Sequence, residues 1–282
     1  MAENEIMDVD VLFVGGGVAS LSGALHLSNL IKKHNKDVEG GAEGKKIDEI
    51  MIAVLEKGAY PGSHGISGAV MDPSSLKDLV PDFEEKGAPL EGEVKKESIY
   101  FLTKGGKIKL PFGLAPKSLN PLYNHGNYII SMSRMNEWLA GLVEENGVDI
   151  FPGFAGTEVL YDGDRVIGVR TGDKGIAADG NKKSNFEPGI DLHAKVTVFG
   201  EGSRGSLAKT LISRFNLDEG RIPAGYEVGV KEVWELPETR LEPGEVVHTM
   251  GYPLKSNTFG GGFAYGMTTV SYTHLRAHET VL

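Results

Sequence analysis

The stretch VDVLFVGGGVASLSGALHL, residues 9–27, predicts a strand, a tight turn and a helix. Apart from Asp10, residues 9–14 are apolar, and three glycines follow them directly. Leucine and alanine then recur at helical spacing from Leu21 onward. This order of elements is the context in which a Gly-x-Gly-x-x-Gly motif binds the pyrophosphate of a dinucleotide at a helix N-terminus.

The motif departs from its usual pattern at the third glycine. It fits only in the register Gly15, Gly17 and position 20, and position 20 is a serine. The third glycine permits close contact between helix and strand, and alanine is tolerated there. Serine adds one hydroxyl, which in a helix can donate to the carbonyl four residues earlier, here that of Gly16. We therefore expect Ser20 to replace the third glycine, with Gly15 and Gly17 near the nucleotide.

A second strand is predicted within residues 49–58, EIMIAVLEKG, and it ends at Glu56. An acidic residue at this place typically bonds the ribose hydroxyls, about 20 residues after the motif. Glu56 comes later than that, and the polar, glycine-rich residues 32–46 account for the excess as a surface insertion. The alternative is a glycine turn that only connects a strand to a helix.

Composition excludes several classes of protein. The chain has 282 residues with 40% hydrophobic content, enough for one large or two smaller globular domains. Its net charge of −10 has the wrong sign for collecting nucleic-acid phosphates. Without cysteine it has no disulfides and no thiolate ligands for zinc or an iron-sulfur cluster. We find no signal or transit peptide and no apolar run of membrane-spanning length, so any membrane contact is expected to be peripheral.

A second strand-to-helix turn follows in DLHAKVTVFGEGSRGSLAK, residues 191–209. The predicted strand ends at Gly200, Glu201 and Gly202, and a helical pattern continues to Phe215. A carboxylate next to glycine before a helix can bond a ribityl chain while its neighbours approach phosphate. An ordinary connecting turn is the alternative.

Several further stretches are specific to one family: LEKGAYPGSHGISGAVMDP, KGAPL, NHGNYII and HTMGYPLKSNTFGGGFAY. With these and residues 191–209, the chain from about Val9 to Met267 resembles the N-terminal, FAD-binding portion of the electron transfer flavoprotein-ubiquinone oxidoreductase family. The resemblance implies an α/β fold, with a Rossmann-like FAD-binding domain of the glutathione-reductase-like superfamily at residues 1–225. That domain includes a β-hairpin or meander at residues 151–173.

The C-terminal part is expected to differ from the FAD-binding domain. The stretches YEVGVKEVWELP, GEVVHTMGYP and TFGGGFAYGM predict strands, and the resemblance makes residues 226–270 the incomplete start of a β-rich domain that faces quinone. Residues 271–282 resemble an adapter-like translated tail and are predicted to be non-native. Residues 110–126 match a family surface that dips into one membrane leaflet, and a covered loop is the alternative.

The resemblance also implies the residues of the sites. The predicted FAD contacts are Gly15, Gly17, Ser20, Glu56, Lys57, Ser67, Gly68, Arg134, Glu201 and Gly202. The predicted ubiquinone contacts are Phe259, Gly260 and Gly261. No catalytic side chain and no metal ligand is implied, and we expect structural hydrogen-bonding roles for His64, His125, His193 and His248.

The implied reaction is electron transfer from reduced electron transfer flavoprotein, through FAD and a 4Fe-4S cluster, to ubiquinone. The cluster ligands of that family are absent from this chain. The implied location is peripheral, on the cytoplasmic face of a bacterial inner membrane or on the mitochondrial inner membrane. Two alternatives stay open: an FAD-dependent reductase or hydroxylase of the same superfamily, such as an isoprenoid reductase, and a non-catalytic fragment.

Overall fold

The computed structural model describes most of the chain: residues 5–66, 68–111, 122–177, 179–223, 225–226, 228–234 and 240–267, and the backbone of 272–274. The chain divides into two compact units. Unit 1 comprises Met1–Gly65 and Ser133–Ile222, and unit 2 comprises Ile66–Met132 and Pro223–Leu282. The sequence assigned residues 66–132 to the first domain, whereas the structure groups them with unit 2. The limits of the functional domains stay a prediction.

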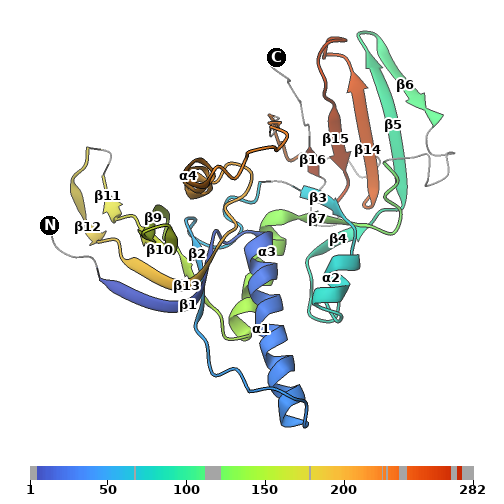
Figure 1. The fold of residues 1–282 in the computed structure, drawn as a ribbon. Coiled ribbons are helices and arrows are strands. Elements are labelled where there is room, and N and C mark those ends of the chain that lie inside the picture. The colour runs from blue at the N-terminus through green and yellow to red at the C-terminus, as the bar shows by residue number, and fades with distance from the viewer. Residues whose placement is uncertain are drawn as a thin grey trace. The chain divides into compact units, whose positions relative to one another are not determined.

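Unit 1 is built on a six-stranded sheet of order β8-β2-β1-β13-β10-β9 (Figure 1). The strands β8, β2, β1 and β13 are parallel, and β10 and β9 continue the sheet in antiparallel fashion. A parallel set with helical crossovers is the doubly wound arrangement that the βαβ pattern predicts. The strands are β1 (Ile6–Val14), β2 (Ile52–Glu56), β8 (Asp149–Pro152), β9 (Gly156–Asp162), β10 (Arg165–Thr171) and β13 (Asp191–Phe199).

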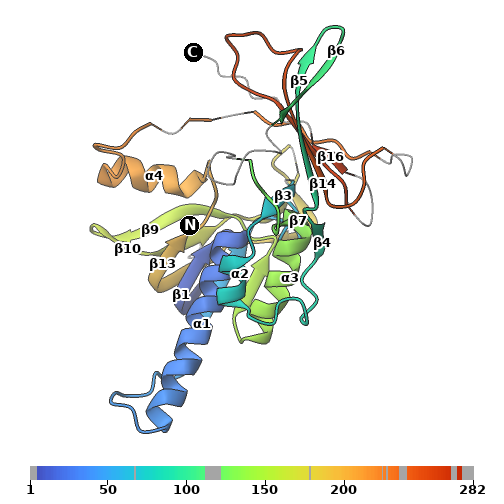
Figure 2. The same ribbon diagram turned by 90° about the vertical axis from the view of Figure 1, so that its right-hand side faces the viewer.

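Helices cover both faces of this sheet. Phe13 and Val14 are consecutive in β1 and therefore point to opposite faces. A Cβ added at Gly23 of α1 would meet the Phe13 ring at 3.0 Å, so α1 packs on that face. Leu207 of α4 is buried in the same core cluster as Val14, on the other face. Figure 2 shows α3 beside α1. The helices are α1 (Val18–Glu39), α3 (Met132–Glu145) and α4 (Ser206–Phe215).

The predicted order of β1, turn, α1 and β2 is confirmed, but the predicted insertion is shorter than residues 32–46. Helix α1 continues through Glu39, and Gly40 ends it by donating its N–H to the Lys36 carbonyl. The lysine-rich end of the helix has good intrinsic helix propensity. Asn35 exchanges two 2.8 Å bonds with the backbone of Ile47 and so holds the remaining loop against the helix.

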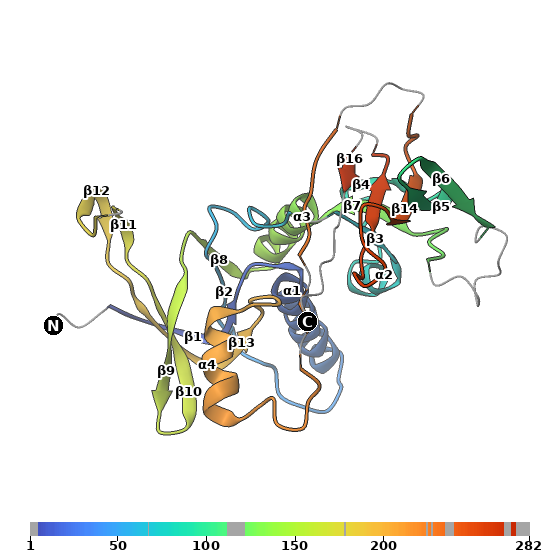
Figure 3. The same cartoon turned by 90° about the horizontal axis from the view of Figure 1, so that it is seen from above.

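Two hairpins extend unit 1 (Figure 3). β9 and β10 pair across the Asp162–Gly163 turn, in the segment predicted as a hairpin or meander. Arg170 ties β10 to its neighbours, because its guanidinium bonds both Asp191 oxygens at 2.7 and 2.8 Å and Glu158 at 2.7 Å. The second hairpin consists of β11 (Lys174–Ile176) and β12 (Lys182–Glu187).

Unit 2 contains a five-stranded sheet of order β16-β15-β14-β5-β6 and a three-stranded sheet of order β3-β7-β4. Ile129 of β7, Val246 of β14 and Tyr265 of β15 are almost completely buried in one cluster, which joins the two sheets. The elements are β3 (Gly68–Met71), α2 (Ser74–Leu79), β4 (Leu90–Glu93), β5 (Lys96–Thr103), β6 (Gly106–Leu110), β7 (Tyr128–Ser131), β14 (Glu245–Gly251), β15 (Gly262–Tyr265) and β16 (Tyr272–His274).

Of the three C-terminal stretches predicted to contain strands, two do so in the described structure. β14 and β15 form where predicted, whereas the described residues 226 and 228–234 form no strand. These residues have no partner strand among those the structure describes, and alternation alone does not make a strand. The backbone of β16, inside the predicted tail, pairs with β15. Residues 112–121 of the predicted membrane-facing stretch lie outside the described residues.

Candidate functional site

A cavity of about 370 Å³ lies in unit 1, at the carboxyl ends of β1, β2 and β13. In doubly wound folds this edge of the sheet is where ligands bind. The cavity is lined mainly by residues 14–17, 55–57, 154–156, 200–202 and 204–206, and additionally by Gly62, His64, Gly65 and Asn136.

The glycine turn after β1 forms one wall of the cavity. Gly15 has a φ of +101°, and a Cβ on it would lie 2.7 Å from the Gly200 carbonyl oxygen, so glycine is required there. A Cβ on Gly17 would meet nothing within 4 Å. Helix α1 begins at this point without an acidic residue in its first turn, and no side chain of the described residues caps it. Its amide groups and dipole are therefore available to an anion.

Ser20 lies where α1 packs against the end of β13. It is 1% exposed, and a Cβ added at Gly200 would lie only 2.1 Å from its hydroxyl oxygen. The Ser20 side chain thus occupies the space between α1 and the end of β13 that is empty when the third residue of the motif is glycine. The expected hydrogen bond to the Gly16 carbonyl is wrong, because the hydroxyl faces Gly200. Within the described part of the chain this hydroxyl has no hydrogen-bond partner.

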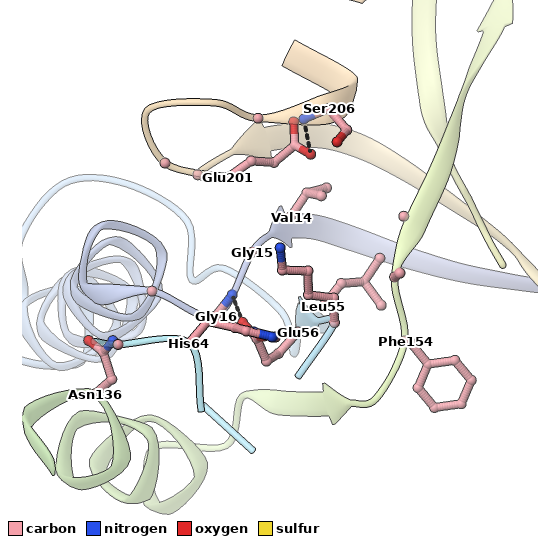
Figure 4. Close-up of a pocket in the computed structure, with 18 of the residues that line it drawn as sticks. Val14, Gly15, Gly16, Leu55, Glu56, His64, Asn136, Phe154, Glu201 and Ser206 are labelled. Carbon is pink, nitrogen blue, oxygen red and sulfur yellow. Dashed lines mark hydrogen bonds and ion pairs between the residues drawn. The ribbon is translucent and has the colours of Figure 1, made fainter. Parts of the chain in front are cut away.

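Glu56, the last residue of β2, is 8% exposed, and its carboxylate is hydrogen-bonded to the glycine turn (Figure 4). Its Oε2 accepts from the Gly16 N–H at 2.8 Å, and its Oε1 accepts from the Gly58 N–H at 2.6 Å. His64 Nδ1 lies 3.6 Å from Oε1. A carboxylate offers about four acceptor positions, so Glu56 retains capacity for further donors such as ribose hydroxyls.

Glu201 caps helix α4. Its Oε1 accepts from the backbone N–H of Ser206 at 3.1 Å and of Leu207 at 3.2 Å, and its Oε2 accepts from that of Ala208 at 2.7 Å. Figure 4 shows this carboxylate turned toward the start of the helix. Three of the four amide groups that a helix start leaves unpaired are thereby satisfied. Gly205 is needed for this arrangement, because a Cβ there would lie 2.7 Å from the Cβ of Glu201.

Some of the residues predicted to bind FAD line the cavity, and others lie elsewhere in the structure. Six of them line the cavity: Gly15, Gly17, Glu56, Lys57, Glu201 and Gly202. Arg134 is exposed at the start of α3 and is not among the lining residues. Gly68 begins β3 in unit 2, and Ser67 lies outside the described residues. The predicted quinone residues Phe259, Gly260 and Gly261 precede β15 in unit 2, with Phe259 73% exposed.

Sequence reasoning missed four polar residues of the cavity: His64, Asn136, Arg204 and Ser206. Arg204 lies between Gly202 and Gly205 in the GEGSRGS turn. Because that turn was predicted to approach a phosphate, the positive charge of Arg204 could have marked it as a site residue. Asn136 comes from the buried side of α3, and no local motif marks it. Among the described residues no group of histidine, aspartate and glutamate could hold a metal ion. None of the described helices combines the length and apolar character needed to cross a membrane.

Known proteins resemble this chain in sequence. The model of the family described as "ETF-QO, ubiquinone-binding" matches residues 226–275. Mitochondrial electron transfer flavoprotein-ubiquinone oxidoreductases from Arabidopsis thaliana and Homo sapiens are 42% and 41% identical to it. These matches cover 94% and 92% of this chain but 39% of each relative. The chain therefore spans about two fifths of the length of these curated relatives.

Solved structures resemble the chain in fold. A flavin-dependent halogenase superposes with a TM-score of 0.59 at 15% identity, covering 97% of this chain and 42% of its own. A geranylgeranyl bacteriochlorophyll reductase-like protein from Thermoplasma acidophilum gives 0.58 at 14% identity, covering 95% and 56%. At such low identity these similarities concern the fold alone, and they confirm the predicted α/β class with a Rossmann-like domain.

Identity above 40% across nearly the whole chain is a much stronger relation than a shared fold. The relatives from plant and human and the matched family model agree with one another. Across nearly its whole length the chain is similar to electron transfer flavoprotein-ubiquinone oxidoreductases, of which it spans about two fifths.

Proposed function

We propose that the cavity of unit 1 binds FAD, and that the complete protein passes electrons from reduced electron transfer flavoprotein to ubiquinone. The observation that carries the FAD proposal is the uncapped start of α1, which opens onto the cavity next to the glycine turn. The names of the relatives support the electron-transfer role. Because the chain spans only part of those relatives, the activity is proposed for the whole protein.

The residues of the cavity fit FAD in three respects. Gly15 and Gly17 let the backbone approach a pyrophosphate, and the amide groups at the start of α1 provide donors for it. Glu56 lies at the end of the second strand, where ribose hydroxyls are bonded in this fold class, and has acceptor positions left. Lys57 and Arg204 add positive charge to the lining.

When bound, FAD supplies the electron-carrying chemistry, and the protein contributes binding and orientation. Glu56 fixes the glycine turn through the Gly16 amide, and Glu201 fixes the turn after β13 by capping α4. Both turns are thereby ordered before a ligand arrives, which reduces the entropy lost on binding. Gly68, Ser67 and Arg134 stay proposed as further contacts, since the resemblance implies them.

Ubiquinone is proposed to bind unit 2 at Phe259, Gly260 and Gly261, inside the segment that matches the ubiquinone-binding family model. The 4Fe-4S cluster of the family does not fit this chain, because the cluster requires cysteine ligands and the chain has none. No step of the proposed function is assigned to the cluster here. We place the complete protein peripherally at a bacterial or mitochondrial inner membrane, with electron transfer flavoprotein as its partner.

The test is FAD binding by the purified chain. Flavin fluorescence quenching should give a saturable curve for FAD, and a thermal melt should rise with FAD concentration as mass action requires. NAD serves as the competing dinucleotide. Gly15→Ala should abolish binding because its Cβ would collide with the Gly200 carbonyl. Gly163→Ala is the matched control, because Gly163 shares a positive φ (+59°) whereas a Cβ there meets no described atom within 4 Å.

The two parts of the proposal fail separately. If NAD binds as tightly as FAD, or if Gly15→Ala binds FAD like the parent chain, the cavity is not the FAD site. Titration with ubiquinone-1, a short-chain and more soluble ubiquinone, tests unit 2 independently. A chain that binds FAD but leaves ubiquinone-1 unbound would refute the quinone site alone.

A further inference from the structure

Unit 2 contains ionisable side chains on the buried face of its five-stranded sheet. In the β5–β14 pairing, Glu97 is opposite Val246 and Ile99 is opposite His248. Residues two apart in a strand share a face, so Glu97 and His248 lie on the same face as Val246, which is completely buried. They are diagonal neighbours on adjacent strands, a position from which side chains interact.

Glu97 is fixed in its place and is linked to the surface. Its side chain is 8% exposed, and it accepts two bonds from Asn124, from the backbone N–H at 3.1 Å and from Nδ2 at 2.7 Å. His125 Nε2 lies 3.8 Å from Oε2 of Glu97, and the His125 side chain is 43% exposed. The buried carboxylate thus has a titratable neighbour that is open to solvent.

His248 presents a buried nitrogen that nothing satisfies. In the described part of the chain its Nε2 has no hydrogen-bond partner, although the atom is removed from solvent. The ring of Phe263 lies beside the imidazole, with ring centroids 4.9 Å apart and ring planes at 40°. Leaving a polar group buried and unpaired is unfavourable, so such a group calls for an explanation such as a bound water or a functional role.

Burial lowers the pKa of His248, and the negative charge of Glu97 opposes this with a smaller effect. Tyr265 of β15 is the other titratable residue on this face of the paired strands β5, β14 and β15 in the described region. Lys96 and Glu245 pair with each other at 3.0 Å and belong to the opposite face. The imidazole is therefore neutral near pH 7 and can both accept and release a proton.

The same hairpin carries the proposed quinone residues. β14 and β15 enclose residues 252–261, and a Cβ added at Gly261 would lie 2.2 Å from the carbonyl oxygen of Thr249, which follows His248. Phe263, whose ring contacts that of His248, comes two residues after Gly261. The unsatisfied imidazole and the loop proposed to hold the quinone headgroup are thus parts of one short element.

We infer that His125, Glu97 and His248 form a proton relay that serves quinone reduction at the β14–β15 hairpin. The inference rests on the proposed quinone site. Reduction of a quinone to a quinol adds two electrons and two protons, one proton to each carbonyl oxygen. Reduced FAD, when bound, would supply the two electrons. The neutral imidazole of His248 accepts a proton that arrives from solvent through His125 and Glu97, and the imidazolium then releases a proton to a quinone oxygen; this happens twice for each quinol formed.

The kinetic test uses the FAD-loaded chain, photoreduced without oxygen and mixed with ubiquinone-1 between pH 5.5 and 8.5. His248→Gln should slow quinol formation by about 100-fold, the lower range for loss of a proton-transferring group. Glu97→Gln should slow it as well, and both variants should lose the pH inflection of the parent chain. The dissociation constant for ubiquinone-1 should change less than threefold. His193→Gln in unit 1 is the matched control and should behave like the parent chain.

A second readout needs no turnover and no flavin. In the chain labelled with ¹⁵N-histidine, ubiquinone-1 should shift the His248 imidazole resonances, which are assigned by their absence in His248→Gln. Glu97→Gln should move the pH at which these resonances titrate. Quinone that binds without shifting them, or His248→Gln that forms quinol at the parent rate, would overturn the relay. Absence of ubiquinone-1 binding in equilibrium dialysis would instead overturn the quinone site, and the relay with it.

Discussion

Replacing Glu201 tests whether this residue acts mainly as a helix cap. In the structure its carboxylate accepts the N–H groups of Ser206, Leu207 and Ala208. Three bonds to a charged acceptor would contribute several kcal/mol if the site were dry, but the start of α4 is partly exposed and water can replace some of them. Loss of a cap typically costs about 1 kcal/mol, and loss of the negative charge at the helix start adds about 0.5 kcal/mol.

We therefore expect Glu201→Ala to lower the free energy of unfolding of the FAD-free chain by about 1.5 kcal/mol. For a unit of this size that corresponds to a fall in melting temperature of about 3–6 °C. Glu201→Gln keeps one oxygen for Ser206 and Leu207 but turns an amide group toward the Ala208 N–H. It should lose roughly half as much. Glu219→Ala, an exposed glutamate beyond the end of α4, is the control.

Urea unfolding followed by circular dichroism measures this effect, and FAD titration of the same variants separates the cap from a ligand role. As a cap, Glu201→Gln should raise the dissociation constant of FAD less than threefold. As a ribityl ligand it would lose a charge-assisted bond of about 1.5–3 kcal/mol, which is roughly a 10- to 100-fold weaker affinity. Unchanged stability together with a 10-fold or greater loss of affinity would refute the capping role.

Three further outcomes can be checked. Ser20→Ala should raise the free energy of unfolding by up to about 1 kcal/mol in urea, because it removes a buried hydroxyl without a partner. Glu56→Gln should weaken FAD binding by about 10-fold or more in fluorescence titration, because the amide cannot accept from both the Gly16 and Gly58 N–H groups through two oxygens. The stability of the chain should fall as the pH drops below about 6.5, the ordinary pKa of histidine, because the pKa of His248 is lowered in the folded state and the unfolded chain then binds more protons. His248→Gln should flatten that decline in urea midpoints measured from pH 7.5 to 5.

The parts of unit 1 that follow from local rules were predictable from sequence. The glycine turn, the end of β2 at Glu56 and the end of α4 at Phe215 each depend on a few consecutive residues. The direction of side chains was harder to predict. Whether the Ser20 hydroxyl bonds back along its own helix or faces Gly200 depends on how closely α1 approaches β13, and that is a tertiary property.

Dependence on tertiary packing also limits how far the site can be predicted from sequence. Asn136 reaches the cavity because α3 packs beside α1, and a helical pattern does not reveal which neighbour it will have. Residues 66–132 belong with unit 2 because β5 pairs with β14, a contact between segments far apart in the chain. Such pairings depend on long-range contacts, whereas hydrophobic periodicity indicates only the type of each element.

The distribution of carboxylates around the cavity determines where an anionic ligand can be held. Two helices, α1 and α4, begin at this cavity. The first turn of any helix has amide groups without intrahelical partners and carries the positive end of the helix dipole. At α4 these are already neutralised by Glu201, whereas at α1 the described structure contains neither a side-chain cap nor an acidic residue in the first turn. Glu56 is directed to the Gly16 amide, two residues before the start of α1, and in the described structure it accepts no bond from the amides of the first turn. We therefore expect a pyrophosphate to gain most at α1, in keeping with the proposed contact between a ribose and Glu56.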